Sequence, residues 1–243
     1  SELTDAQAAV LSASQVQSIE TADLQQIGNL QLQALSTAAI RGMGTDQISS
    51  LTATQVANLT TAQVTALNAD QMVAMTTAQI SKFTMEQMPA LTTAQVAAIE
   101  TADLVKLTNS QLESITTAGI EALNTTQVNA ITTSQIKALT AAQVTALGAD
   151  VAAIATDQLR LLADEQVSAI TTAGIVALTT NQVTSLKATQ VAAMTTAQVA
   201  AIENADLLVL TQAQLNSMSQ EQWNAISGSN QTAITGAGKT APY

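Results

Sequence analysis

Apolar residues recur along this chain with a period of eight residues, which is the period of neither a helix nor a strand. The segment Leu91–Ala98 shows the general form: apolar, Thr, Thr, Ala, Gln, apolar, any residue, small. We number these positions slots one to eight. The pattern runs from Leu3 to Ala225 as 27 octads and one heptad, 147–153, which lacks the slot-five residue. Short fixed periods are typical of solenoids, so we expect one array over residues 1–226.

Neither one long helix nor a set of strands fits this period. A helix turns about 100° per residue, so eight residues overshoot two turns by roughly 80° and the apolar slots would leave any one face. In a strand, slots one and six have opposite parity and would point to opposite faces of a sheet. Each octad must therefore contain its own short element.

A short N-capped helix accounts for every slot. Thr92 and Gln95 form the two halves of a capping box, and Leu91 and Val96 form the hydrophobic staple around it. Slot five is Gln in 21 of the 28 units. Helices of fewer than about twelve residues are marginal in water, so these must stack. The sequence predicts an all-α superhelical solenoid of very short N-capped helices, one per eight-residue repeat.

Further slots and charges add detail to this prediction. We expect the apolar slots one and six to fill the core, and Ala at slots four and eight to let neighbouring backbones approach. Of the 17 acidic residues in the array, 15 occupy slots two to five, whereas five of its six basic residues occupy slots seven or eight. Carboxylates favour helix N-termini and cations favour C-termini, so this segregation supports the helices. The pattern leaves the hand of the superhelix and the octads per turn open.

At three places the sequence departs from the repeat, and we expect the structure to be irregular there. The heptad 147–153 predicts a local kink. Gly119 and Gly174 stand where slot five has Gln. The tail, 227–243, is rich in Gly and contains Pro242, so we expect poor helix there and interpret it as a C-terminal cap or a flexible linker. Trp223, at slot six of the last full unit, is expected to plug the open end.

Composition excludes several classes of function. The net charge is −11 with only seven basic residues, which argues against nucleic acid as a partner. There is no Cys and no His, so disulfides, thiolate metal sites and the usual general base are absent. Polar residues, mostly Thr and Gln, interrupt every unit, so no membrane span is expected. The start at Ser1, with no basic and apolar leader, predicts a mature protein or an excised fragment. We expect no enzyme, no catalytic residue and no cofactor.

Acidic pairs of the form Glu-x-x-Asp are the candidate metal ligands. Calcium takes six to eight oxygen ligands, so one pair is too few unless several converge, and at helix starts these carboxylates need no ion. Ranks of Thr could order water, although slot-two Thr already serves as a cap. The weak calcium candidates are Glu20, Asp23, Glu100, Asp103, Glu203 and Asp206.

A segment near the C-terminus, Gly236–Thr240, resembles the end of a phosphate-binding loop. That motif requires a Gly five residues before Gly238, whereas this chain has Ala233 there, and it requires a following helix. We therefore expect no nucleotide site.

The octads Leu91–Ala98, Ile131–Ala138 and Met194–Ala201 resemble the Thr-Thr-Ala-Gln octapeptide tracts of very large bacterial surface or secreted proteins. Such proteins are often labelled adhesin-like or haem-utilisation proteins. The resemblance implies an extracellular or cell-surface location and a non-catalytic structural rod, a spacer or filament-forming segment. It implies self-association end to end or a place within a larger surface protein. The alternative is a surface-adhesion or calcium-binding module that uses the acidic pairs.

Overall fold

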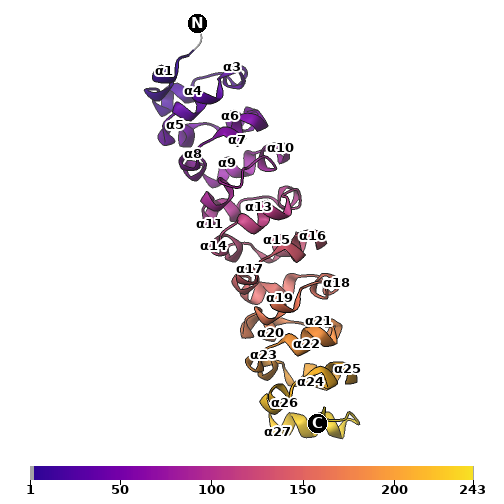
Figure 1. The fold of residues 1–243 in the computed structure, drawn as a ribbon. Coiled ribbons are helices and arrows are strands. Elements are labelled where there is room, and N and C mark those ends of the chain that lie inside the picture. The colour runs from indigo at the N-terminus through magenta and orange to yellow at the C-terminus, as the bar shows by residue number, and fades with distance from the viewer. Residues whose placement is uncertain (1–2, 243) are drawn as a thin grey trace. The chain divides into compact units, whose positions relative to one another are not determined.

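The structure is a computed structural model that describes residues 3–242, and within them every regular element is a helix (Figure 1). Most helices have four to six residues, one to each octad. The all-α solenoid of very short helices that the octads predict is thereby confirmed.

The chain divides into two compact units, residues 1–123 and 124–243, which are described separately below. The helices of the first unit are α1 (Asp5–Ala9), α2 (Ala13–Gln17), α3 (Thr21–Gln26), α4 (Asn29–Ala34), α5 (Thr37–Gly42), α6 (Thr45–Ser50), α7 (Ala53–Asn58), α8 (Thr61–Ala66), α9 (Ala69–Ala74), α10 (Thr77–Ile80), the 3₁₀ helix η1 (Met88–Ala90), α11 (Thr93–Ala97), α12 (Thr101–Leu104), α13 (Asn109–Ser114) and α14 (Thr117–Glu121).

The second unit continues the same series. Its helices are α15 (Thr125–Ala130), α16 (Thr133–Ala138), α17 (Ala141–Ala146), the 3₁₀ helix η2 (Gly148–Ala153), α18 (Thr156–Leu159), α19 (Asp164–Ser168), α20 (Thr172–Ala177), α21 (Thr180–Ser185), α22 (Ala188–Ala193), α23 (Thr196–Ala201), α24 (Asn204–Val209), α25 (Gln212–Ser217), α26 (Gln220–Ala225) and α27 (Gly228–Gly236). That the two units form the single array of residues 1–226 stays a prediction.

Helices stack on the third helix along the chain. In the first unit α2 packs on α5, α5 on α8 and α6 on α9, and Figure 1 shows α5 and α8 one beneath the other. In the second unit α20 packs on α23 and α22 on α25. Each turn of the stack therefore takes about three octads, a number that the pattern of the sequence leaves open.

The core holds slots one, five and six. Slot-six Val56 and Val64 are fully buried, and slot-one Leu59 and Leu67 expose only 4% and 3% of their surface. Slot four was expected to lie between backbones, but Ala94 is exposed. The physical reason is that a helix places slot four about 200° from slot six, on the outer side. Slot eight is partly buried, as Ala98 shows.

The heptad 147–153 changes the backbone locally without breaking the core of the second unit. Leu147 takes αR angles, with ψ −23°, where slot-one Leu139 has ψ 133°. Gly148 follows with φ +53°, a conformation that favours glycine, and the chain then forms η2. Val151 and Ile154 still fill the core, with exposures of 0% and 1%. The predicted kink is thus a change of helix type that the stack absorbs.

The tail forms the longest helix in the described chain, α27, so the expectation of poor helix was wrong for residues 228–236, whereas residues 237–242 are not helical. Ser227 caps it by accepting a hydrogen bond from the backbone N–H of Asn230 at 3.4 Å. Gly228 and Gly236 occupy its first and last positions, where glycine costs least. Ile234 is fully buried. Trp223 lies in the core like other slot-six residues, but α27 follows it, so it is not the end of the stack.

No helix within residues 3–242 is long and apolar enough to cross a membrane.

Replacing Gly174 by Ala is expected to destabilise the second unit by about 1–3 kcal/mol, because overpacking forces neighbours to move. A Cβ there would lie 2.8 Å from the carbonyl oxygen of Gly148, 2.8 Å from Ile170 Cγ2 and 2.9 Å from Val151 Cγ1. The measurement is urea-induced unfolding followed by circular dichroism. The matched control is Gly228→Ala, where a Cβ meets nothing within 4 Å and stability should hold or rise slightly. Equal effects of the two substitutions would contradict the packing described for η2.

Candidate functional site

The predicted capping box is present in most octads that pair Thr, Ser or Asn at slot two with Gln at slot five. In α8 the backbone N–H of Thr60 donates to Gln63 Oε1 at 3.0 Å, and the backbone N–H of Gln63 donates to Thr60 Oγ1 at 3.2 Å. The same pair of bonds joins Thr92 and Gln95, at 2.8 and 3.3 Å. Lys187 has no hydroxyl at slot two, and there the Gln half of the box remains: the N–H of Lys187 donates to Gln190 Oε1 at 2.9 Å.

The other end of the Gln side chain has a second role that the sequence analysis missed. Gln63 Nε2 donates to the carbonyl oxygens of Leu32, Gln33 and Leu35, at 2.8, 3.1 and 2.9 Å. These carbonyls belong to the C-terminal end of α4, four octads earlier in the chain. One amide therefore connects the N-terminus of one helix to the C-terminus of another.

The bond recurs at most slot-five glutamines, and we call this set the glutamine ladder. Each member donates to a slot-six carbonyl, the following slot-one carbonyl, or both, in the helix four octads earlier, with small shifts where that helix ends irregularly. Members whose bonds lie within one unit are Gln47, Gln55, Gln63, Gln71, Gln79, Gln87, Gln95 and Gln111 in the first, and Gln158, Gln166, Gln182, Gln190, Gln198, Gln214 and Gln222 in the second.

The glutamine ladder matters because most backbone N–H and C=O groups of a short helix lie in its first or last turn. A helix leaves four N–H groups and four C=O groups without intrahelical partners, which in a six-residue helix is nearly all of them. Leaving one such buried group unpaired costs about 1–3 kcal/mol. Gln63, only 2% exposed, satisfies an N–H and several C=O groups at once.

The choice of Gln over Glu is the signal that could have revealed this role. A capping box accepts either residue, because only a side-chain oxygen is needed. Slot five is never Glu in this chain, although Glu occurs at slots two, four and seven. Of these two side chains, only the Gln amide can accept at its oxygen while donating at its nitrogen, which is what the second bond requires.

The glutamine ladder also explains how the stack absorbs the heptad. Gln166 Nε2 donates to the carbonyls of Ile136 and Leu139, 30 and 27 residues earlier, whereas Gln63 reaches back 31 and 28. Both pairs are slots six and one, so the slots are kept and only the residue count changes. In the octad directly after the heptad, Gln158 keeps one bond, to Ile131, and its buried Oε1 has no partner.

The acidic candidates lie singly at helix starts. Asp103 and Asp206 occupy slot five, are each 4% exposed, and cannot donate to a carbonyl as Gln does. Asp103 Oδ1 instead accepts from Thr77 Oγ1 at 2.5 Å. Asp23 is exposed.

The glutamates of these pairs stand at the N-cap positions of α3, α12 and α24 without side-chain cap bonds. They are Glu20, Glu100 and Glu203. Within residues 3–242 no three Asp or Glu side chains gather closely enough to hold a metal ion together. The structure therefore does not bring the candidate pairs together, and calcium binding stays a hypothesis.

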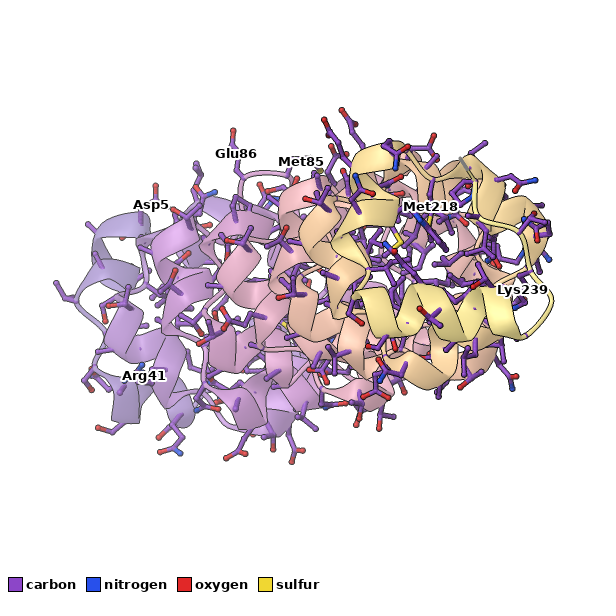
Figure 2. The ribbon with its side chains drawn as sticks, turned by 90° about the horizontal axis from the view of Figure 1, so that it is seen from below. Asp5, Arg41, Met85, Glu86, Met218 and Lys239 are labelled. Atoms are coloured by element: carbon purple, nitrogen blue, oxygen red, sulfur yellow. The ribbon has the colours of Figure 1, made fainter. Side chains whose placement is uncertain are left out.

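The segment at Gly236–Thr240 serves the backbone rather than a phosphate. Lys239 Nζ donates to the carbonyl oxygens of Leu208 and Leu210 at the C-terminal end of α24, where a ladder Gln would otherwise bind. Gln212 and Thr240 exchange two hydrogen bonds of 3.0 Å beside it. Figure 2 shows Lys239 in the connection that follows α27.

Charged groups are otherwise dispersed over the surface. In the first unit Asp5 and Glu86 point outward along one edge, and Arg41 lies at the opposite edge (Figure 2). Arg41, a slot-seven residue, donates from Nε to the carbonyl of Ala66 at 3.3 Å, and slot-seven Gln33 does the same to Asn58 at 2.7 Å. These surface bonds add links between successive turns.

Comparison with known proteins identifies the repeat. A family model described as the ALTTAQ repeat matches residues 16–61, 96–133 and 120–149, which together are fewer than half of the chain. No curated protein matches the chain. The match supports a repeat tract and concerns the octads alone.

Replacing Gln63 by Ala is expected to destabilise the protein by on the order of 3 kcal/mol, because two buried carbonyls and one N–H lose their partner. The measurement is the free energy of unfolding in urea. Gln15→Ala is the matched control: Gln15 forms the same box, accepting from Ser12 N–H at 2.9 Å, but its Nε2 has no carbonyl partner in the described chain. That change should cost about 1 kcal/mol, as for loss of a cap.

Gln63→Glu isolates the donor half of the same residue. It keeps the acceptor for Thr60 but faces two carbonyl oxygens with a carboxylate, so it should destabilise at least as much as Ala does. A Glu variant as stable as the original chain would show that the Nε2 bonds contribute nothing.

Replacing Lys239 by Ala is expected to speed amide hydrogen exchange in α27 by about tenfold, since two charge-assisted bonds are lost. Lys82→Ala, at a slot-eight surface position, is the control and should leave α27 unchanged. Unchanged exchange in both variants would favour a flexible linker over a cap at 227–243.

Proposed function

We propose that this chain is a non-catalytic structural rod, a spacer or filament-forming segment of an extracellular bacterial surface protein. The observation that carries the proposal is the glutamine ladder. The slot-five Gln, present in 21 of the 28 units, is mostly buried and occupied in joining successive turns, so it is not available to bind a ligand.

A spacer needs a length that can be set by the number of repeats. In this stack the length is set by the number of octads. Most octads with Gln at slot five repeat the same bonds to the octads three and four positions earlier, as Gln63 and Gln79 show. Stability in such arrays is a sum of nearest-neighbour interfaces, so adding or removing turns changes length without requiring a new core.

The surface supports a passive role outside the cell. The residues with acid–base chemistry are mostly separate carboxylates at helix starts, which stabilise the helix dipole. The exposed slots carry Thr, Ser, Ala and Gln with few cations, and the net charge is −11. The Thr-Thr-Ala-Gln tracts that these octads resemble belong to surface or secreted proteins, which supports the location.

Deleting residues 51–74, three whole octads, tests the spacer directly. The phase is kept, and Gln79 would then meet the carbonyls of Leu24 and Ile27, which Gln55 now occupies. We expect a helical, cooperatively unfolding protein whose particles are shorter by one turn in electron microscopy. Deleting 51–70 shifts the phase by half an octad and should lower stability by several kcal/mol, since core slots turn outward.

Equal tolerance of both deletions would contradict a length set by octads. The same micrographs show whether the protein forms discrete rods or end-to-end fibres.

The alternative, a surface-adhesion or calcium-binding module, has its own readout. A melting temperature that rises with millimolar Ca²⁺ and falls with EDTA would favour it over a passive spacer. We expect the two melting curves to coincide.

A further inference from the structure

Two buried aspartates occupy slot five, where the glutamine ladder has its donors. Asp103 in the first unit and Asp206 in the second are each 4% exposed. Asp103 Oδ1 accepts one hydrogen bond, from Thr77 Oγ1, whereas the carboxylate of Asp206 has neither a hydrogen bond nor an ion pair within residues 3–242. Buried charges in proteins are paired or bind a metal ion, because removing a carboxylate from water is costly. Among the described residues, neither aspartate has the positive partner that its burial requires.

The register of the glutamine ladder shows which backbone atoms these carboxylates face. Gln95, one octad before Asp103, donates to the carbonyl oxygen 28 residues earlier, at 2.7 Å. The same count leads from Asp103 to Met75 and from Asp206 to Leu178. Within residues 3–242 neither of these two carbonyl oxygens accepts a hydrogen bond, although Met75 and Leu178 are each only 4% exposed. An ionised carboxylate has no donor to offer them.

A threonine belongs to each of these groups of oxygen atoms. Thr77 follows Met75 by two residues, so its hydrogen bond to Asp103 holds the carboxylate beside that stretch of backbone. Thr180 stands 26 residues before Asp206, as Thr77 stands 26 residues before Asp103. The helices that contain them, α21 and α24, pack on each other as α10 and α12 do. The same residue types therefore recur in the same places, once in each unit.

We propose that Asp103 and Asp206 each bind one small hard cation, held by the carboxylate, the threonine hydroxyl and the unpaired carbonyl oxygen. Hard cations prefer oxygen ligands, and these groups contain no other kind. Each group has a single carboxylate, because Glu100 and Glu203 of the same octads are exposed at their helix starts. One negative charge balances one positive charge, so Na⁺ fits better than Ca²⁺, whose affinity depends on the number of charged ligands. The proposal goes beyond the spacer function.

The length of the aspartate side chain agrees with a bound ion. Asp is shorter than Gln by one C–C bond, about 1.5 Å, so its oxygens end farther from the carbonyl than a Gln nitrogen does. Added to the 2.7 Å that separates Gln95 Nε2 from its carbonyl oxygen, this gives about 4.2 Å between the two oxygens. An ion that lies about 2.3–2.6 Å from each oxygen bridges such a distance. In these two octads the ion takes the place of the amide as the link between turns.

Exchanging the cation of the buffer tests the two sites. The full chain is melted in sodium chloride and in tetramethylammonium chloride at the same ionic strength, about 0.15 M. Tetramethylammonium is too large to enter, so the Tm should be about 2–4 °C higher in the sodium salt. Asp103→Gln with Asp206→Gln restores the ladder donors and should abolish this difference. Asp46→Asn with Asp70→Asn removes two exposed carboxylates instead and, as the charge-matched control, should keep it.

Three results would overturn the proposal. Equal melting temperatures in the two salts would show that no small cation is bound. A difference that persists in the double Gln variant would place the ion elsewhere. A larger rise in Tm with millimolar Ca²⁺ than with Na⁺, lost in that variant, would make the ion divalent and contradict the charge count. Sodium NMR gives a direct readout, since the original chain should broaden the resonance more than the double Gln variant does. The spacer proposal is tested by particle length, so the two stand or fail separately.

Discussion

Unpaired backbone ends are the constraint on which this fold depends. Helices of four to six residues have almost no internal hydrogen bonds to offset their exposed N–H and C=O groups, and alone they would not form. Burying them in a stack increases the penalty unless every end finds a partner. The slot-five amide meets this need with one side chain, accepting at a helix start and donating at a helix end, as Gln63 does between α8 and α4.

The sequence predicts the parts of this arrangement better than their assembly. Capping boxes, staples and the core slots one and six follow from local rules, because each involves residues within one octad. The number of octads per turn and the Nε2 bonds involve residues about 30 positions apart, and an eight-residue period contains no information on such distances. The sequence did hold one unused indication, the absence of Glu from slot five.

The irregular residues show the same logic. Gly174 stands at slot five because η2 brings the carbonyl of Gly148 into the space of a side chain, so a Gln could not enter. Lys239 appears near the C-terminus, where a long cation can reach the carbonyls of α24 from outside the octad phase. Local propensity argued against helix in the tail, yet burial of Ile234 against the stack outweighs the glycines. In all three places, contacts between residues far apart in the sequence outweigh the local pattern.

The chemical neutrality of the amide has a consequence for where such a protein can work. The joints between turns are bonds from uncharged Gln side chains to backbone carbonyls, so neither proton concentration nor ionic strength changes the groups that form them. In a stack held by ion pairs, high salt would screen these pairs and acid would protonate their carboxylates, so the stack would be less stable. One joined by glutamine keeps these hydrogen bonds over a wide range of pH and salt concentration.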